Sequence, residues 1–172
     1  MPTLADALAL LAQAKLRRIY IELKGSQKNK QPLLEAIVAL VGEFQLEQSV
    51  TLLSFDHAII RRAGLMAESI RRAATFSIAG RGSLSARSIL DSARRASADE
   101  VALHYGLATR RTVDALHESG MAVSAWTVNR KIVCRRLAAC GVDSIMTNFP
   151  DRMINVLQSQ GRDRKRRISD AR

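Results

Sequence analysis

Aromatic residues make up only 4% of this 172-residue chain, although 47% of its residues are hydrophobic. The core must therefore consist mainly of Leu, Ile, Val and Ala, a composition that suits helices packed on buried parallel strands. Such a high apolar fraction is not typical of a disordered chain. The length fits one domain of ordinary size.

Cysteine is scarcer still, and Cys134 and Cys140 are the two in the sequence. They lie six residues apart on one predicted helix and face different sides, so we expect neither a disulfide nor a metal site. Unpaired thiols are typical of a reducing compartment. The sequence also lacks an apolar run of about 18 residues and a signal-peptide pattern. These absences predict a cytoplasmic protein without a membrane span.

Acidic residues are outnumbered, and the formal net charge is +11. Six basic and two acidic residues fall in residues 161–172, which we expect to form a basic, disordered tail. The remaining excess is spread over Arg–Arg pairs, such as those at 17–18 and 71–72, and solvated helix faces explain it most simply. Because no aromatic residues are interleaved with the basic tail, nucleic acid is not an expected partner.

Strand and helix patterns alternate along residues 1–160. Runs rich in β-branched residues, together with their place in the alternation, predict strands at 18–24, 50–54, 74–78, 100–104, 121–128 and 142–147. Helical spacing predicts helices at 4–15, 32–41, 85–95, 109–119 and 130–139, a short one after His57 and a last one from Pro150. Strict alternation predicts a parallel α/β sheet whose functional groups lie where the strands end.

Charged residues end the first predicted strand. Because side chains two residues apart share a face, Tyr20, Glu22 and Lys24 are expected to point inward together. An inward Glu and Lys are costly unless they are paired or used, so a buried ion pair and a binding site are both open interpretations. Asp56, after the second strand, is either a ligand or the cap of the next helix, and we expect the cap.

Other strand ends carry weaker signals. Trp126 is the single tryptophan, and it either walls a pocket or packs under the helices. Asn148 lies near Pro150, where it could cap the last helix. The sequence shows no phosphate loop, no clear nucleophile and no cluster with metal-ligand spacing, and the histidines at 57, 104 and 117 are scattered.

Five short motifs follow one another in a distinctive order: Pro2-Thr-Leu4, Ile21-Glu-Leu-Lys24, Ser54-Phe-Asp56, Trp126-Thr-Val-Asn129 and Gly141-Val-Asp-Ser-Ile-Met-Thr-Asn-Phe-Pro-Asp151. In this order and at these separations they resemble the glycerophosphodiester phosphodiesterase family, over residues 1–158. The last two motifs are the most specific part of the resemblance.

The resemblance implies an incomplete (β/α)8 TIM-type barrel in residues 1–160, with about six β/α units that correspond to strands three to eight. Family members hydrolyse glycerophosphodiesters to glycerol 3-phosphate and an alcohol, with Mg²⁺ or Ca²⁺ as cofactor. On this resemblance Glu22 is a metal ligand and Lys24 binds the substrate phosphate. Trp126 then lines the pocket, and Phe55 and Asn148 lie at its rim.

The chain also departs from the family pattern. The family's His-Arg-Gly, Glu-x-Asp and His-Asp motifs have no counterpart here, and His57 and His104 stand in the wrong places to replace them. No catalytic residue is therefore assigned, and we expect weak or no activity, with a truncated or split reading frame as the hypothesis for the origin of the chain. The alternative is a non-catalytic barrel that binds phosphate esters or an anionic surface.

An incomplete barrel would also leave two open edges. The strands at Tyr20 and Ile145 are expected to be unpaired on one side, and open edges favour self-association.

Overall fold

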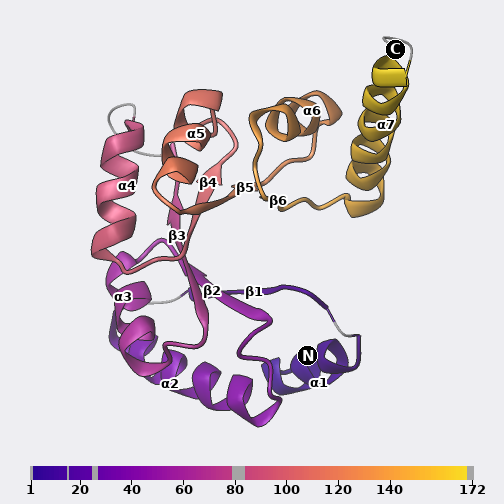
Figure 1. The fold of residues 1–172 in the computed structure, drawn as a ribbon. Helices are drawn as coiled ribbons and strands as arrows, with labels where there is room; N and C mark the ends of the chain where they lie inside the picture. Colours follow the sequence, from indigo (N-terminus) through magenta and orange to yellow (C-terminus); the bar gives the residue numbers. More distant parts are fainter. Residues whose placement is uncertain (1, 15, 25–26, 79–83, 170–172) are drawn as a thin grey trace. The chain divides into compact units, whose positions relative to one another are not determined.

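The computed structural model describes residues 2–14, 16–24, 27–78 and 84–169 (Figure 1). Within these ranges, strands and helices alternate as the sequence predicts. The strands are β1 (Ile19–Glu22), β2 (Val50–Ser54), β3 (Arg71–Phe76), β4 (Glu100–His104), β5 (Ala122–Trp126) and β6 (Ser144–Ile145). The helices are α1 (Leu4–Gln13), α2 (Gln27–Glu43), α3 (His57–Met66), α4 (Ala86–Arg95), α5 (Arg110–Glu118), α6 (Lys131–Cys140) and α7 (Pro150–Ser169).

The strands follow one another in the sheet in sequence order, from β1 to β6. β1 pairs with β2, β2 with β3, and β5 with β6, all in parallel. In this register Tyr20 is opposite Thr51, and Thr51 is opposite Arg71. The predicted parallel α/β arrangement is therefore confirmed.

The chain divides into two compact units. The first contains Met1–Thr75 and Asp91–Val101. Its core consists mostly of aliphatic side chains, among them the fully buried Leu52 on β2, Leu34 on α2 and Ile60 on α3. Helices α2 and α3 pack against each other, and α3 also packs on β2 (Figure 1).

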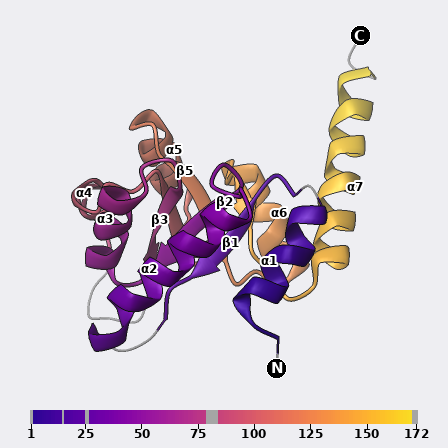
Figure 2. The same cartoon turned by 90° about the horizontal axis from the view of Figure 1, so that it is seen from below.

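The second unit contains Phe76–Leu90 and Ala102–Arg172. Its core includes Leu116 of α5, Val123 of β5 and Leu137 of α6, all fully buried. Helix α5 packs on β5, and α6 packs along α7 (Figure 2). α6 ends at Cys140 and is capped by Gly141, whose φ of 87° is the left-handed conformation that glycine adopts without strain.

Strand β3 begins at Arg71, three residues before the predicted start. Arg72 is buried there, so the expectation that this Arg–Arg pair lies on a solvated helix face was wrong. Its guanidinium donates to the Asp99 carboxylate at 2.9 Å and to the carbonyls of Ser97 and Glu68. These acceptors compensate the cost of burying the charge.

Two helices also differ from the expected bounds. α2 begins at Gln27, so Pro32 lies inside the helix and not at its start. α7 extends through Ser169, beyond the expected end near Gly161. The basic side chains from residue 161 onward lie outside the described part of the chain, and the division into barrel and tail stays a prediction. Among the described residues, no helix combines the length and apolar character needed to cross a membrane.

Candidate functional site

Glu22 and Lys24 meet at the carboxyl end of β1. Leu23 between them is buried, and the Lys24 ammonium lies 3.2 Å from the Glu22 carboxylate. The Lys24 side chain is 77% exposed, and the Glu22 side chain is 30% exposed. The predicted ion pair therefore forms, but at the surface and not buried. Exposed pairs are worth about 0–1 kcal/mol, so an anionic ligand can draw Lys24 away from Glu22 at little cost.

Ser54, at the end of β2, connects two strand ends. Its buried hydroxyl donates to the Leu23 carbonyl at 2.9 Å and accepts from the Asp56 amide at 3.1 Å. The Leu23 amide donates to the Leu53 carbonyl at 2.8 Å. Sequence reasoning assigned Ser54 no role, and its place in the Ser-Phe-Asp motif was the one available signal.

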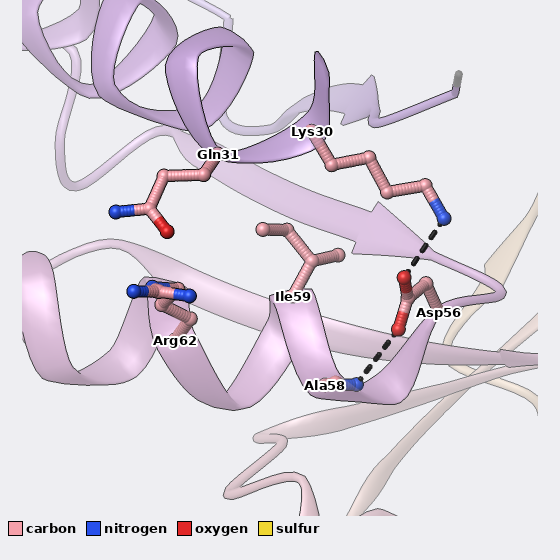
Figure 3. A pocket seen from close by; sticks show the side chains of 6 residues that line it. All are labelled: Lys30, Gln31, Asp56, Ala58, Ile59 and Arg62. Carbon is pink, nitrogen blue, oxygen red and sulfur yellow. Dashed lines mark hydrogen bonds and ion pairs between the residues drawn. The ribbon is translucent and has the colours of Figure 1, made fainter. Parts of the chain in front are cut away.

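Asp56 caps helix α3, as predicted. One carboxylate oxygen accepts from the Ala58 amide at 3.0 Å, and the other accepts from the Lys30 ammonium at 2.8 Å (Figure 3). The Lys30 and Asp56 side chains are only 14% and 13% exposed. Their ion pair was not predicted, and it joins the first turns of α2 and α3. A cavity of about 130 Å³ adjoins the pair and is also lined by Gln31, Ile59 and Arg62.

His57 makes structural contacts through both ring nitrogens. Nε2 lies 3.1 Å from the Thr75 carbonyl oxygen, which can only accept, so Nε2 carries the proton. Nδ1 then accepts from the Ser92 hydroxyl at 3.0 Å. With both nitrogens engaged, His57 is poorly placed to act as a general acid or base. Phe55 lies in the same unit and is 51% exposed.

In the second unit, Trp126 packs against His104. The indole N–H donates to the Ala102 carbonyl at 3.1 Å, and the ring meets the imidazole edge-on with centroids 5.4 Å apart. His104 Nδ1 accepts from the Gly106 amide at 3.1 Å, which places the proton on Nε2. A Cβ at Gly106 would lie 3.2 Å from that nitrogen, so glycine permits this turn.

Sequence reasoning missed this contact between His104 and Trp126. Both residues end consecutive strands, β4 and β5, and that shared position is the signal that could have paired them.

Asn129 joins the ends of β5 and β6. Its side-chain oxygen accepts from the Thr147 hydroxyl at 3.2 Å and from the Asn148 amide at 3.0 Å. This contact connects the Trp-Thr-Val-Asn motif to the Thr-Asn-Phe-Pro motif. The Thr147 hydroxyl in turn accepts from the Phe149 amide at 3.0 Å, beside the start of α7.

The predicted residues are thus distributed over both units. Glu22, Lys24 and Phe55 belong to the first, whereas Trp126 and Asn148 belong to the second. Their roles at a binding site stay predictions.

The carboxylates do not form an evident divalent-cation site. Among the described residues, no three or more His, Cys, Asp or Glu side chains group so that they could hold a metal ion. Glu22 contacts Lys24, and both oxygens of Asp56 are already bound. Mg²⁺ and Ca²⁺ take about six or more oxygen ligands. The donor set that the structure describes therefore does not fit such an ion.

Comparison with known proteins decides the family. A sequence profile of the glycerophosphoryl diester phosphodiesterase family matches residues 1–152. The chain belongs to this family. A glycerophosphodiester phosphodiesterase of Bacillus altitudinis is 26% identical to it over 157 residues, which are 91% of this chain and 62% of that protein.

Solved structures of phosphodiesterases share the fold. A protein of Silicibacter pomeroyi assigned as a glycerophosphoryl diester phosphodiesterase superposes with a TM-score of 0.84 at 24% identity, over 93% of this chain and 57% of its own. A phosphodiesterase of Oleispira antarctica, solved with its product sn-glycerol-3-phosphate, gives 0.80 at 17% identity, over 91% and 61%. These likenesses confirm the predicted incomplete TIM-type barrel. The chain spans about three-fifths of the length of these relatives.

Proposed function

We propose that this glycerophosphodiester phosphodiesterase-like chain binds the phosphate group of a glycerophosphodiester or phosphate ester through Lys24. The observation that carries the proposal is the exposed Lys24 ammonium, held 3.2 Å from Glu22 where β1 ends. The carboxyl ends of parallel strands are the usual position of binding groups in this class of fold.

The chemistry of a phosphodiester suits this arrangement. Its single negative charge forms charge-assisted hydrogen bonds with an ammonium group. Glu22 orients Lys24 when no ligand is bound and releases it when a phosphate oxygen takes its place. The relative from Oleispira antarctica was solved with sn-glycerol-3-phosphate, which supports a glycerol phosphate as the ligand. Phe55, in the same unit as Lys24, is the proposed contact for the remainder of the ligand, and the roles of Trp126 and Asn148 stay predictions.

We also propose that the groups of this chain bind such esters without hydrolysing them at an appreciable rate. General acid–base catalysis typically contributes about 10²–10⁴-fold to a rate, and both ring nitrogens of His57 are engaged in structural contacts. The described carboxylates do not fit Mg²⁺ or Ca²⁺, so no catalytic step is assigned to a cation. The free thiols of Cys134 and Cys140 support a reducing, cytoplasmic location as part of the proposal.

Calorimetric titration with sn-glycerol 3-phosphate tests the proposed binding. We expect saturable binding by the wild-type chain and its loss in Lys24→Ala. Lys131→Ala is the matched control, because Lys131 is an exposed lysine at the start of α6 and should be dispensable. Equal affinities for all three proteins would contradict the assignment of Lys24.

The alternative function, binding of an anionic surface by the basic tail, predicts the reverse. Deletion from Gly161 onward would then abolish binding to acidic lipid vesicles, Lys24→Ala would not, and the affinity would fall steeply with salt.

A further inference from the structure

We propose that Ser54, Asp56 and Lys30 form a clamp that positions the backbone of Lys24 for phosphate binding. The proposal rests on the proposed function, because it concerns the same lysine. Ser54, Asp56 and Lys30 are here positioning residues, which act through Lys24 and do not contact the ligand. All of them belong to the first unit.

The first half of the clamp fixes Leu23, the residue before Lys24. Its amide donates to Leu53 at 2.8 Å, and its carbonyl accepts from the Ser54 hydroxyl at 2.9 Å. A hydroxyl has one proton to donate, so the contact from the Asp56 amide at 3.1 Å uses an oxygen lone pair. Ser54 therefore links the end of β1 to the residue that caps α3, and alanine could replace neither contact.

The second half of the clamp fixes Lys30. Lys30 lies six residues after Lys24, in the first turns of α2, and its ammonium donates to Asp56 at 2.8 Å (Figure 3). Asp56 is held in turn by the Ala58 amide and by Ser54. Ser54 and Asp56 thus hold two points of the chain, Leu23 directly before Lys24 and Lys30 in α2.

The clamp combines a fixed backbone with an exposed side chain. Ser54 is buried and the Lys30–Asp56 pair is nearly so, whereas the Lys24 side chain is 77% exposed. A backbone that is ordered before the ligand arrives does not have to be ordered on binding, which favours affinity. Loosening the clamp should therefore weaken ligand binding even though Lys24 itself is unchanged.

The test compares Ser54→Ala with two controls in the full chain. Ser124→Ala is matched in chemistry, because Ser124 is equally buried on β5 but its hydroxyl has no partner among the described residues. Thr109→Ala is matched in lost stability, because Thr109 caps α5 in the second unit. We expect the Kd for sn-glycerol 3-phosphate to rise about threefold to tenfold in Ser54→Ala, the effect of losing about one hydrogen bond, and to stay unchanged in both controls.

Two further variants separate positioning from folding. Ser54→Thr keeps the hydroxyl and should restore most of the affinity. Lys30→Met leaves the cap of α3 in place and should weaken binding in the same direction as Ser54→Ala. An unchanged Kd in both Ser54→Ala and Lys30→Met, or equal weakening in Thr109→Ala, would overturn the clamp.

Amide hydrogen exchange at Leu23 distinguishes failure of the clamp from failure of the proposed function. If the wild-type chain does not bind sn-glycerol 3-phosphate, the proposed function is wrong, and exchange alone decides the clamp. Exchange at Leu23 that is about tenfold faster in Ser54→Ala than in Ser124→Ala would support the clamp, since local opening controls exchange. Equal rates would overturn it.

Discussion

Replacing Tyr20 by Phe removes a hydrogen bond to a buried charge. Glu100 is fully buried at the start of β4, and its carboxylate accepts from the Tyr20 hydroxyl at 2.8 Å and from Arg18 at 3.0 Å. The variant keeps the aromatic ring and removes the hydroxyl, which donates to Glu100 and also accepts from Arg18 at 3.3 Å. Because hydrogen bonds to charged groups contribute about 1.5–3 kcal/mol, we expect the free energy of unfolding to fall by about 2 kcal/mol. For a chain of this size that is a Tm lower by about 4–8 °C.

Thr51→Val is the matched control. Thr51 is the register neighbour of Tyr20 on β2, and its buried hydroxyl has no hydrogen-bond partner among the described residues. Exchanging that hydroxyl for a methyl group should leave stability unchanged or raise it slightly. Urea unfolding would be followed by circular dichroism and by the fluorescence of Trp126. Coincident transitions are required, because the chain comprises two compact units that could unfold separately.

The reasoning would be refuted if Tyr20→Phe and Thr51→Val changed the free energy of unfolding equally, within about 0.5 kcal/mol. The phenol would then contribute no more to stability than an unpartnered hydroxyl, and Glu100 would owe its burial to other contacts.

Three further predictions concern acid, thiol reactivity and assembly. Hydrogen bonds from Thr3 hold the pKa of the Asp6 carboxyl below its ordinary value of 3.8. Its contribution to stability is therefore complete above pH 3.8 and is lost as the pH falls through the lowered pKa. Thermal scans at several pH values should show a smaller loss of stability in acid for Asp6→Asn than for the wild-type chain. Burial raises the pKa of the Cys134 thiol, so mass spectrometry after iodoacetamide treatment should find Cys140 modified first, and preferential modification of Cys134 would contradict its burial. β1 and β6 end the sheet order, so sedimentation should detect self-association that increases with concentration, and a monomer at all concentrations would argue against open edges.

Local sequence signals predicted the elements well. The cap at Asp56 depends on a residue next to the helix that it starts, and the structure confirms it. The alternation of strands and helices followed from β-branched runs and helical spacing, which are also local. The first turns of α2, before Pro32, were not predicted. Proline indicated the start of the helix, but here it lies inside the helix.

Contacts between residues distant in sequence were not predictable. Arg72 pairs with Asp99, which lies 27 residues later in the sequence. This partner allows an arginine that was expected to be solvated to lie in a buried strand. Lys30 pairs with Asp56, which lies 26 residues later in the sequence. Asp56, expected to cap α3, therefore also forms an ion pair. At the candidate site, the spacing of Glu22 and Lys24 predicted that they meet, but not that Lys24 would be mostly exposed.

Hydrolysis of glycerophosphocholine by the purified chain tests the proposal that the chain binds phosphate esters without hydrolysing them. The assay would be run with Mg²⁺, with Ca²⁺ and with a chelator, beside Glu22→Ala, on protein shown by circular dichroism to be folded. We expect no appreciable turnover under any of these conditions, in a protein that nevertheless binds sn-glycerol 3-phosphate through Lys24. Metal-dependent turnover that disappears in Glu22→Ala would contradict it and would show that the chain carries a complete catalytic site.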